Sequence, residues 1–302
     1  MSEPQPSWEL YETFLEVIRG GSLSAASRSL GVAQPTVRRR VEALEAALGA
    51  VLFTRAPNGL TPTPAAEAMR PLAETMAASA GALVRSASAP MTASAGTVRL
   101  AASEIVGVEV LPPILARLRA RHPAIAIELV LSNRNEDLLR RDADVAVRMV
   151  APTQAALVAR RAGEVEVGLY ASEAYLASRR APRRAAELPR HALVGDDRAR
   201  SLREGLAAVG IALSPRDFAL RTDSHLAQLA AVRAGVGIGP CQRPLAERDG
   251  LLRVLPSLAF PLGIWIVTHE ELRPVQRVRA VFDHLVEALA AYASSRPMRR
   301  EA

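Results

Sequence analysis

Residues 21–48, GSLSAASRSLGVAQPTVRRRVEALEAAL, constrain the fold of this chain most strongly. Their pattern predicts a first helix over about residues 24–30 and a second helix from Gln34 onward, joined by a tight turn. Gly31 can end the first helix in the left-handed conformation. Pro35 is tolerated in the first turn of the second helix, because the N–H that it lacks would have no intrahelical partner there. These features predict a helix-turn-helix unit.

The second helix has one apolar face and one basic face. Its apolar residues recur at helical spacing and predict an inward stripe of Val37, Val41, Leu44 and Leu48. The side chains that point away from the stripe are Pro35, Thr36, Arg38 and Arg39, with Gln34 and Arg40 on its flanks. Such a helix suits the DNA major groove, where arginine can read guanine and glutamine can read adenine. The alternative is an ordinary packing helix with a solvated basic face.

About sixty residues of the N-terminal segment resemble, in order and spacing, the winged helix-turn-helix domain of the LysR-type transcriptional regulators. The resemblance lies in Phe14-Leu15-Glu16-Val17, Gly21-Ser22-Leu23-Ser24-Ala25-Ala26, Leu30-Gly31-Val32, Gln34-Pro35, Ala43-Leu44-Glu45, Leu48-Gly49, Leu52-Phe53-Thr54-Arg55 and Thr63-Pro64-Ala65. Residues 50–53 predict a strand and residues 55–61 a turn, which together would form a short β-wing. The resemblance implies double-stranded operator DNA as a partner, with an arginine of the wing touching phosphate. The implied DNA-binding residues are Ser24, Gln34, Pro35, Thr36, Arg38, Arg39 and, in the wing, Arg55.

The chain departs from the family pattern at three positions. Ala33 stands where a capping serine is usual, and the missing cap would cost about 1 kcal/mol of helix stability. Arg38 replaces a small polar residue, which could change the preferred operator bases, and Ala66 replaces a glycine. For the first helix, either Ser22 or Ser24 can supply the N-cap oxygen.

Composition favours a protein of two or three domains, since the chain has 302 residues and 49% are hydrophobic. No window approaches the length of apolar sequence that spans a membrane, and the polar, acidic N-terminus does not read as a signal peptide. We therefore expect a cytoplasmic protein without a membrane partner. Cys241 is the only cysteine, which excludes an internal disulfide, and we expect it to be a buried structural thiol.

The net charge of +7 favours a nucleic-acid partner, and arginine supplies all of the basic side chains. This is weak evidence by itself, because residues 1–65 carry six arginines against six acidic residues. The local balance over residues 20–65 is nevertheless basic. Most of the excess charge lies outside this segment and has no specific explanation in the sequence.

Residues 63–89 predict a long helix. Apolar or small residues alternate spacings of four and three along it, at Met69, Ala73, Met76, Ala80 and Leu83. Such a row can face the helix's own domain, whereas the family resemblance implies a linker helix that pairs two protomers into a homodimer or homotetramer. We expect residues 1–65 to form the winged helix-turn-helix domain, 66–95 the linker helix and hinge, and 96–302 the effector domain.

Strands and helices alternate from residue 97, and the first of them follow a βαβαβ order that predicts a parallel sheet. We expect strands at 97–102, 125–131, 144–148, 165–171, 192–194, 217–221, 236–239 and 263–268, and helices at 110–121, 136–141, 224–234 and 274–292. The overall class is α/β with a small N-terminal domain. The pattern resembles the two-lobe type 2 periplasmic-binding-protein fold that LysR-type regulators use for effectors. Lobe 1 would comprise about 96–167 and 269–302, and lobe 2 about 168–268.

Ligands of open α/β sheets bind beyond the carboxyl ends of the strands. At those ends lie Ser103, Glu104, Asn133, Arg148, Asp223 and Ser224, which are the candidate effector-binding residues. Arg148 could hold a carboxylate, so the small-molecule effector could be anionic. Alternatively, the serines and Asp223 only cap helices, and Arg148 only pairs with Glu104 or Asp144.

Enzyme motifs are absent from the sequence. The GxGxG of residues 235–239 lies between a helix and a strand, whereas a dinucleotide site needs strand, turn and helix in that order. We find no Walker A, HExxH or GxSxG motif, and the five histidines lack metal-ligand spacing. We therefore expect no catalytic residue, metal or cofactor. The alternative function is a cytosolic small-molecule binding protein or enzyme that uses its N-terminal helices only for dimerisation.

Overall fold

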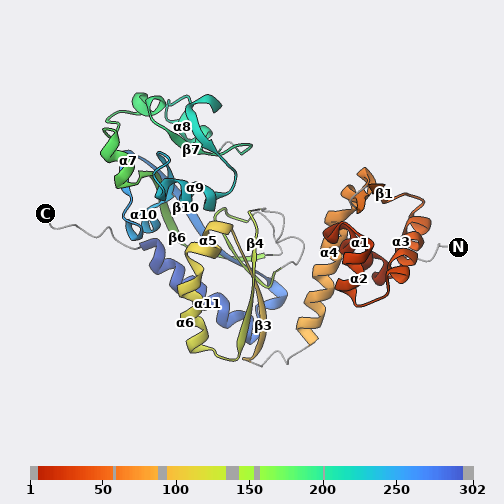
Figure 1. The fold of residues 1–302 in the computed structure, drawn as a ribbon. Helices are drawn as coiled ribbons and strands as arrows, with labels where there is room; N and C mark the ends of the chain where they lie inside the picture. The colour runs from red at the N-terminus through yellow and green to blue at the C-terminus, as the bar shows by residue number, and fades with distance from the viewer. Residues whose placement is uncertain are drawn as a thin grey trace. The chain divides into compact units, whose positions relative to one another are not determined.

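The computed structural model describes residues 6–56, 59–87, 94–133, 143–152, 157–199 and 201–294. The described residues divide into two compact units, one that ends at Val84 and one that begins at Arg85 (Figure 1). Each unit has its own hydrophobic core and is described separately. The predicted helix over 136–141 and most of the expected hinge fall outside the described residues.

The N-terminal unit is a bundle of helices with a two-stranded wing. Its elements are α1 (Trp8–Gly20), α2 (Leu23–Leu30), α3 (Gln34–Leu48), β1 (Phe53–Ala56), β2 (Gly59–Pro62) and α4 (Pro64–Ala87). Phe14, Leu44 and Leu52 are fully buried in its core, and the rings of Phe14 and Phe53 contact each other at a centroid distance of 5.8 Å. The winged helix-turn-helix fold that the sequence predicted is confirmed.

The wing strand begins three residues later than expected. We predicted a strand over residues 50–53 followed by a turn containing Arg55, but Arg55 lies inside β1, opposite Leu60 of β2. The carboxylate of Glu45 explains the shift. Its Oε1 accepts hydrogen bonds from the backbone N–H groups of Leu52 (2.6 Å) and Phe53 (3.2 Å), so α3 holds the segment before the strand.

The row of apolar residues on α4 divides between two environments. Ala73 is buried and Met69 packs against the core of the N-terminal unit. Met76 and Leu83 are 41% and 72% exposed. The first half of the row therefore follows the first of the two alternatives, because the first turns of α4 complete the core of their own domain.

The C-terminal unit is built around a mixed sheet with the strand order β4-β3-β5-β10-β6-β9. β3 runs parallel to β4 and β5, whereas β10 is antiparallel to both of its neighbours and β9 is antiparallel to β6. The strands are β3 (Gly96–Ala102), β4 (Ile125–Leu131), β5 (Val145–Arg148), β6 (Leu157–Ala171), β9 (Gly239–Gln242) and β10 (Leu252–His269). β7 (Leu193–Gly195) and β8 (Phe218–Arg221) form a separate parallel pair. The predicted parallel pairing is confirmed for β3, β4 and β5, which are the strands of the βαβαβ order, whereas β6, β9 and β10 of the same sheet pair antiparallel.

Two strands are much longer than the sequence indicated. β6 and β10 pair along most of their lengths, although prolines and a glycine interrupt the apolar pattern of β10. A bulge between Val254 and Ala259, where Leu255 has a φ of 49°, absorbs the irregularity. The predicted strand over 236–239 also shifts to β9, because Ile238 instead forms an isolated bridge to Leu193 of β7.

Helices cover the sheet and fill both lobes. They are α5 (Glu104–Glu109), α6 (Leu111–Arg121), α7 (Glu173–Ser178), α8 (Ser201–Ala208), α9 (His225–Arg233), α10 (Arg243–Arg248) and α11 (Gln276–Ser294). Figure 1 shows α6 and α11 with β3 and β4 at one end of this unit, α7 and α8 with β7 at the other, and α5, α9 and α10 between them. One hydrophobic core extends from α6 and α11 to α9 and α10, and a second one lies around α7, α8 and β7, which agrees with the two-lobe prediction.

Candidate functional site: a basic helix surface and an interlobe cavity

The outward face of α3 matches the predicted DNA-contacting surface. Gln34, Pro35, Arg38 and Arg39 are exposed and Thr36 is half-buried, whereas Val37, Val41 and Leu44 are buried. Leu48 is 38% exposed, so the predicted apolar stripe ends one turn early. This happens because the chain leaves α3 at Gly49, which adopts the left-handed conformation with a φ of 61°.

The arginines of this face differ in their partners. Arg40 donates to the carboxylate of Glu9 at 2.9 Å. Within the part of the chain that the structure describes, Arg38, Arg39 and the wing residue Arg55 form no ion pair. These three exposed guanidinium groups are therefore available to an anionic partner, and arginine can bind phosphate or a guanine edge bidentately.

The turns that hold the two helices follow the sequence prediction in part. The Oγ of Ser22 accepts a hydrogen bond from the N–H of Ala25 at 3.2 Å and is the cap of α2, whereas Ser24 lies within α2 and is exposed. Gly31 ends α2 with a φ of 66°. Ala33 gives α3 no side-chain cap, as its methyl group dictates.

The wing is fixed against the turn between α1 and α2. The N–H of Leu60 donates to the carbonyl oxygen of Gly21 at 2.9 Å. Gly59 has a φ of 137°, and a Cβ atom at this position would lie 2.4 Å from the same oxygen. Only glycine fits this close approach, which places β1 and its exposed Arg55 in a defined position beside the helices.

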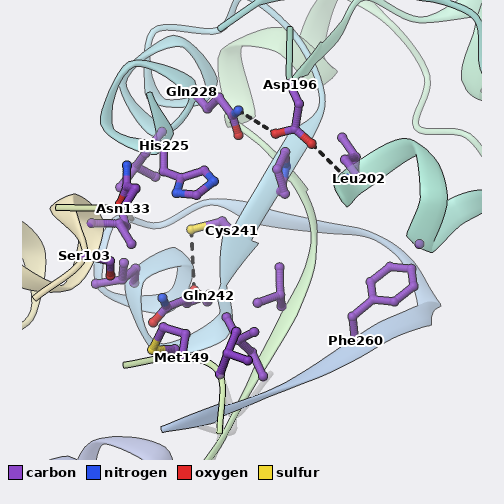
Figure 2. Close-up of a pocket in the computed structure, with 18 of the residues that line it drawn as sticks. Ser103, Asn133, Met149, Asp196, Leu202, His225, Gln228, Cys241, Gln242 and Phe260 are labelled. Atoms are coloured by element: carbon purple, nitrogen blue, oxygen red, sulfur yellow. Dashed lines mark hydrogen bonds between the residues drawn. The ribbon is translucent and has the colours of Figure 1, made fainter. Parts of the chain in front are cut away.

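The C-terminal unit contains a cavity of about 570 Å³ between its two lobes (Figure 2). This volume is in the range of small-molecule sites, and the wall is mainly apolar. The carboxyl ends of β3, β4, β5 and β7 reach it, together with α8, α9, α10 and the middle of β10. The cavity therefore lies where the strand-end argument placed it.

Three of the six predicted effector residues line the cavity, namely Ser103, Asn133 and Arg148. The Oγ of Ser103 is buried and has no hydrogen-bond partner among the described residues. The side-chain oxygen of Asn133 accepts from the N–H of Glu104 at 3.1 Å. Arg148 is only 5% exposed, and its Nη1 donates to the carbonyl oxygen of Ser132 at 3.2 Å.

The other three predicted residues have structural contacts instead. Asp223 accepts hydrogen bonds from three successive backbone N–H groups, at residues 197–199. Desolvation raises the pKa of Asp223, but these donors outweigh it and the net direction is downward. Ser224 caps α9 through the N–H of Ala227, and its Oγ donates to Glu104 at 3.4 Å. The contacts of Asp223 and Ser224 agree with the alternative in which these residues stabilise local backbone, and Glu104, which accepts from Ser224, does not line the cavity either.

Comparison with known proteins identifies both units. Residues 8–67 match the family model "Bacterial regulatory helix-turn-helix protein, lysR family", and residues 92–290 match "LysR substrate binding domain". The chain belongs to the LysR family of transcriptional regulators. The two matched ranges correspond to the two units of the structure, so the resemblance to the LysR-type regulators that the sequence showed is confirmed.

Individual relatives agree with the family match. A "Probable HTH-type transcriptional regulator LtrA" of Klebsiella pneumoniae is 26% identical over 294 residues, which cover 92% of this chain and 93% of that protein. An "HTH-type transcriptional regulator" of Xanthomonas campestris is 32% identical over 167 residues, 54% of this chain and 47% of that one. A solved structure entitled "Crystal structure of full-length CbnR complexed with the target DNA complex" has the same fold, with a TM-score of 0.65, 21% identity and coverage of 93% and 99%.

The cavity of this LysR-family chain includes polar residues that the sequence analysis missed. Asp196 and Gln228 are 4% and 2% exposed and line the wall, together with His225 and Gln242. Asp196 follows the buried strand β7, which is the same signal that identified the other strand-end residues, so it could have been found. Gln228 lies on α9, and Gln242 ends β9, a strand that the sequence placed at 236–239 instead, so only the tertiary structure brings these two residues to the cavity.

An ion cluster joins the three helices α5, α9 and α10. Glu109 at the end of α5 accepts two hydrogen bonds from Arg233 of α9, at 2.8 and 2.9 Å, and also pairs with Arg248 of α10. Asp249 in turn pairs with both arginines. The hydrogen bond from Arg233 outweighs desolvation and, with Arg248, lowers the pKa of Glu109 to about 2.

The described residues indicate neither a metal site nor a reactive thiol. In the described ranges, no group of three or more histidine, cysteine or acidic side chains is placed to hold a metal ion. Cys241 lines the cavity, and desolvation raises the pKa of its thiol to about 12.

The GxGxG glycines have a packing role, because a Cβ on Gly237 would lie 2.2 Å from the carbonyl oxygen of Ala192. Among the described helices, none is both long and apolar enough to cross a bilayer.

Proposed function

We propose that this regulator binds double-stranded operator DNA through α3 and the wing. The exposed guanidinium groups of Arg38 and Arg39 carry the proposal, since they project from a helix whose other face is buried and have no ion partner among the described residues. Gln34, Pro35, Thr36 and Ser24 lie on or beside the same surface and complete the proposed contact set. Arg55 adds a phosphate contact from β1.

A gel-shift titration against the intergenic DNA beside the protein's own gene tests this. Arg38→Ala and Arg39→Ala should each weaken specific binding by roughly 5- to 150-fold, the range expected for one base contact. Arg55→Ala should weaken binding to all sequences and lower the salt dependence by about one phosphate. Arg117→Ala, which removes an exposed arginine of α6, is the control. If both α3 variants retard the specific DNA as strongly as the wild-type protein does, the assignment of α3 as the DNA-binding helix is refuted.

We propose that the protein acts as a homodimer or homotetramer, paired through the outer face of α4. Leu72, Leu83 and Val84 are 70–72% exposed there, with Met76 beside them, which is unusual for large apolar side chains on a helix. A dimer would present two copies of α3 to a partly palindromic operator. Leu83→Glu should lower the mass of the particle measured by sedimentation from oligomer toward monomer. An unchanged mass would exclude this face of α4 as the interface between protomers.

We propose that the interlobe cavity binds a small effector that controls the DNA-bound state. Its largely apolar wall fits an apolar body, and Ser103, Asn133 and Arg148 at the strand ends would hold a polar or anionic group. A thermal-shift screen of small carboxylates should give a stabilising ligand whose effect falls in Arg148→Ala and persists in Arg117→Ala. If the ligand raises the melting temperature equally in both variants, Arg148 does not contribute to ligand binding.

We propose regulation without catalysis, in the cytoplasm. The one thiol of the cavity is held protonated by its raised pKa, which disfavours a nucleophilic role. We assign residues 1–65 to the DNA-binding domain, 66–95 to the linker and 96–302 to the effector domain, with lobe 2 at about 168–268.

A further inference from the structure

The lobe-2 end of the cavity contains a buried carboxylate that has no cationic partner among the described residues. Asp196 is 4% exposed and lines the cavity wall. Its Oδ2 accepts from the backbone N–H of Leu202 at 2.9 Å, and its Oδ1 accepts from Nε2 of Gln228 at 3.0 Å (Figure 2). Both donors are neutral, and no arginine or histidine of the described chain forms an ion pair with it. A buried charge is costly unless a charge of opposite sign compensates it.

The neighbouring amide adds a second acceptor at the same end. Nε2 of Gln228 also donates to the carbonyl oxygen of Thr222 at 2.6 Å, so both of its N–H bonds are engaged. The two acceptors fix the amide orientation and leave Oε1 of Gln228 as an acceptor on a residue that lines the cavity. This end therefore offers oxygen acceptors and one negative charge.

The opposite end of the cavity has the reverse character. Figure 2 shows Asp196 and Gln228 well separated from Ser103 and Met149, with Phe260 on a third side. Arg148 and Asn133 belong to the strand ends near Ser103, whereas Leu202, Leu229 and Phe260 supply apolar wall. An occupant that complements the whole cavity needs an apolar body and a cationic donor group directed at Asp196.

We propose that the effector carries a protonated nitrogen, such as an ammonium group, which binds the Asp196 carboxylate and the Gln228 amide oxygen. The nitrogen supplies the charge that the buried carboxylate lacks and donates to both acceptors. Together with the contacts proposed at Arg148, this makes an apolar compound with separated ammonium and carboxylate groups the best-matched ligand class. The inference rests on the proposal that the cavity is the effector site.

Matched probes of one size test the charge preference directly. We would measure binding of phenylalkyl amines, the corresponding alcohols and the corresponding carboxylates, with two to four methylene groups, to the full-length protein by calorimetry at pH 7. The amines should bind wild-type protein at least tenfold more tightly than the alcohols. Alcohols that bind as tightly as the amines, or a series in which no amine binds, would overturn the proposal, whereas carboxylates are expected to bind at Arg148 and serve as the reference for that end of the cavity.

Two neighbouring aspartates provide matched variants. Asp196→Asn keeps the shape and removes the charge, and should reduce the preference for amine over alcohol to less than about threefold. Asp197→Asn changes the adjacent residue, which pairs with Arg221 and does not line the cavity, and should keep the full preference. An Asp196→Asn protein that keeps the preference would refute the assignment. If that variant does not fold, the comparison of amine with alcohol on wild-type protein still decides.

A gel shift separates this inference from the proposed regulation. An amine that binds through Asp196 without altering DNA retardation would remove the effector role and leave the ligand class intact. Conversely, retardation that responds only to probes without a nitrogen would overturn the ligand class and leave the regulatory role intact.

Discussion

Replacing Glu109 by glutamine should destabilise the effector domain, because this carboxylate joins α5 to α9 and α10. Its pKa falls from 4.5 to about 2 in the folded protein, which corresponds to roughly 3 kcal/mol of stabilisation at neutral pH. The Glu109 side chain is 14% exposed, but that of Arg248 is 46% exposed, so solvent screens part of the interaction. We expect Glu109→Gln to lower the free energy of unfolding by about 2 kcal/mol at pH 7.

The pH dependence of this loss follows from the direction of the pKa change. A lowered pKa means that the unfolded chain binds the proton first on acidification. The stabilisation is therefore complete above about pH 5, and it disappears as the pH falls from there toward 2. Wild-type protein and the variant should accordingly become equal in stability at the acid end of this range.

Urea unfolding followed by tryptophan fluorescence measures the effect in the right domain. The two tryptophans lie one in each unit, Trp8 in α1 and Trp265 in β10, so a Trp8→Phe background reports the effector domain alone. Glu128→Gln is the matched control, since Glu128 is 51% exposed and pairs with Arg99 at 3.3 Å. It should change stability by less than about 0.5 kcal/mol. A Glu109→Gln loss no larger than that of the control would refute the reasoning.

Three further changes test other parts of the structure. Ala33→Ser should restore the missing cap of α3 and raise the unfolding free energy by about 1 kcal/mol in urea, whereas a loss would show that the backbone there cannot use a cap. Cys241 should resist iodoacetamide at pH 8 in the folded protein and react in urea, because its pKa of about 12 leaves almost no thiolate; rapid labelling without urea would contradict this. Gly237→Ala should lower the melting temperature, since the new Cβ would lie 2.2 Å from the carbonyl oxygen of Ala192. Gly250→Ala is the comparison, because its new Cβ meets open space and any loss of stability there comes from backbone strain and not from a close contact.

Local patterns in the sequence determined the DNA-binding half of this protein. The spacing of Val37, Val41 and Leu44 fixes which face of α3 is buried, and Arg38 and Arg39 must then point outward. Helix periodicity and turn residues act over a few residues, so they can be read without the rest of the chain. The same is true of the first parallel strands and of the residues at their ends.

The tertiary structure decided what local patterns do not contain. The antiparallel course of β10 depends on its pairing with strands about a hundred residues away, so the local pattern of this strand does not contain its direction. Likewise, Asp223 and Asp196 both follow short strands of lobe 2, yet only Asp196 reaches the cavity, while Asp223 is engaged by the backbone of residues 197–199. Which of two similar carboxylates faces the cavity is set by how the lobes pack, because burial and hydrogen-bond partners are properties of the folded chain.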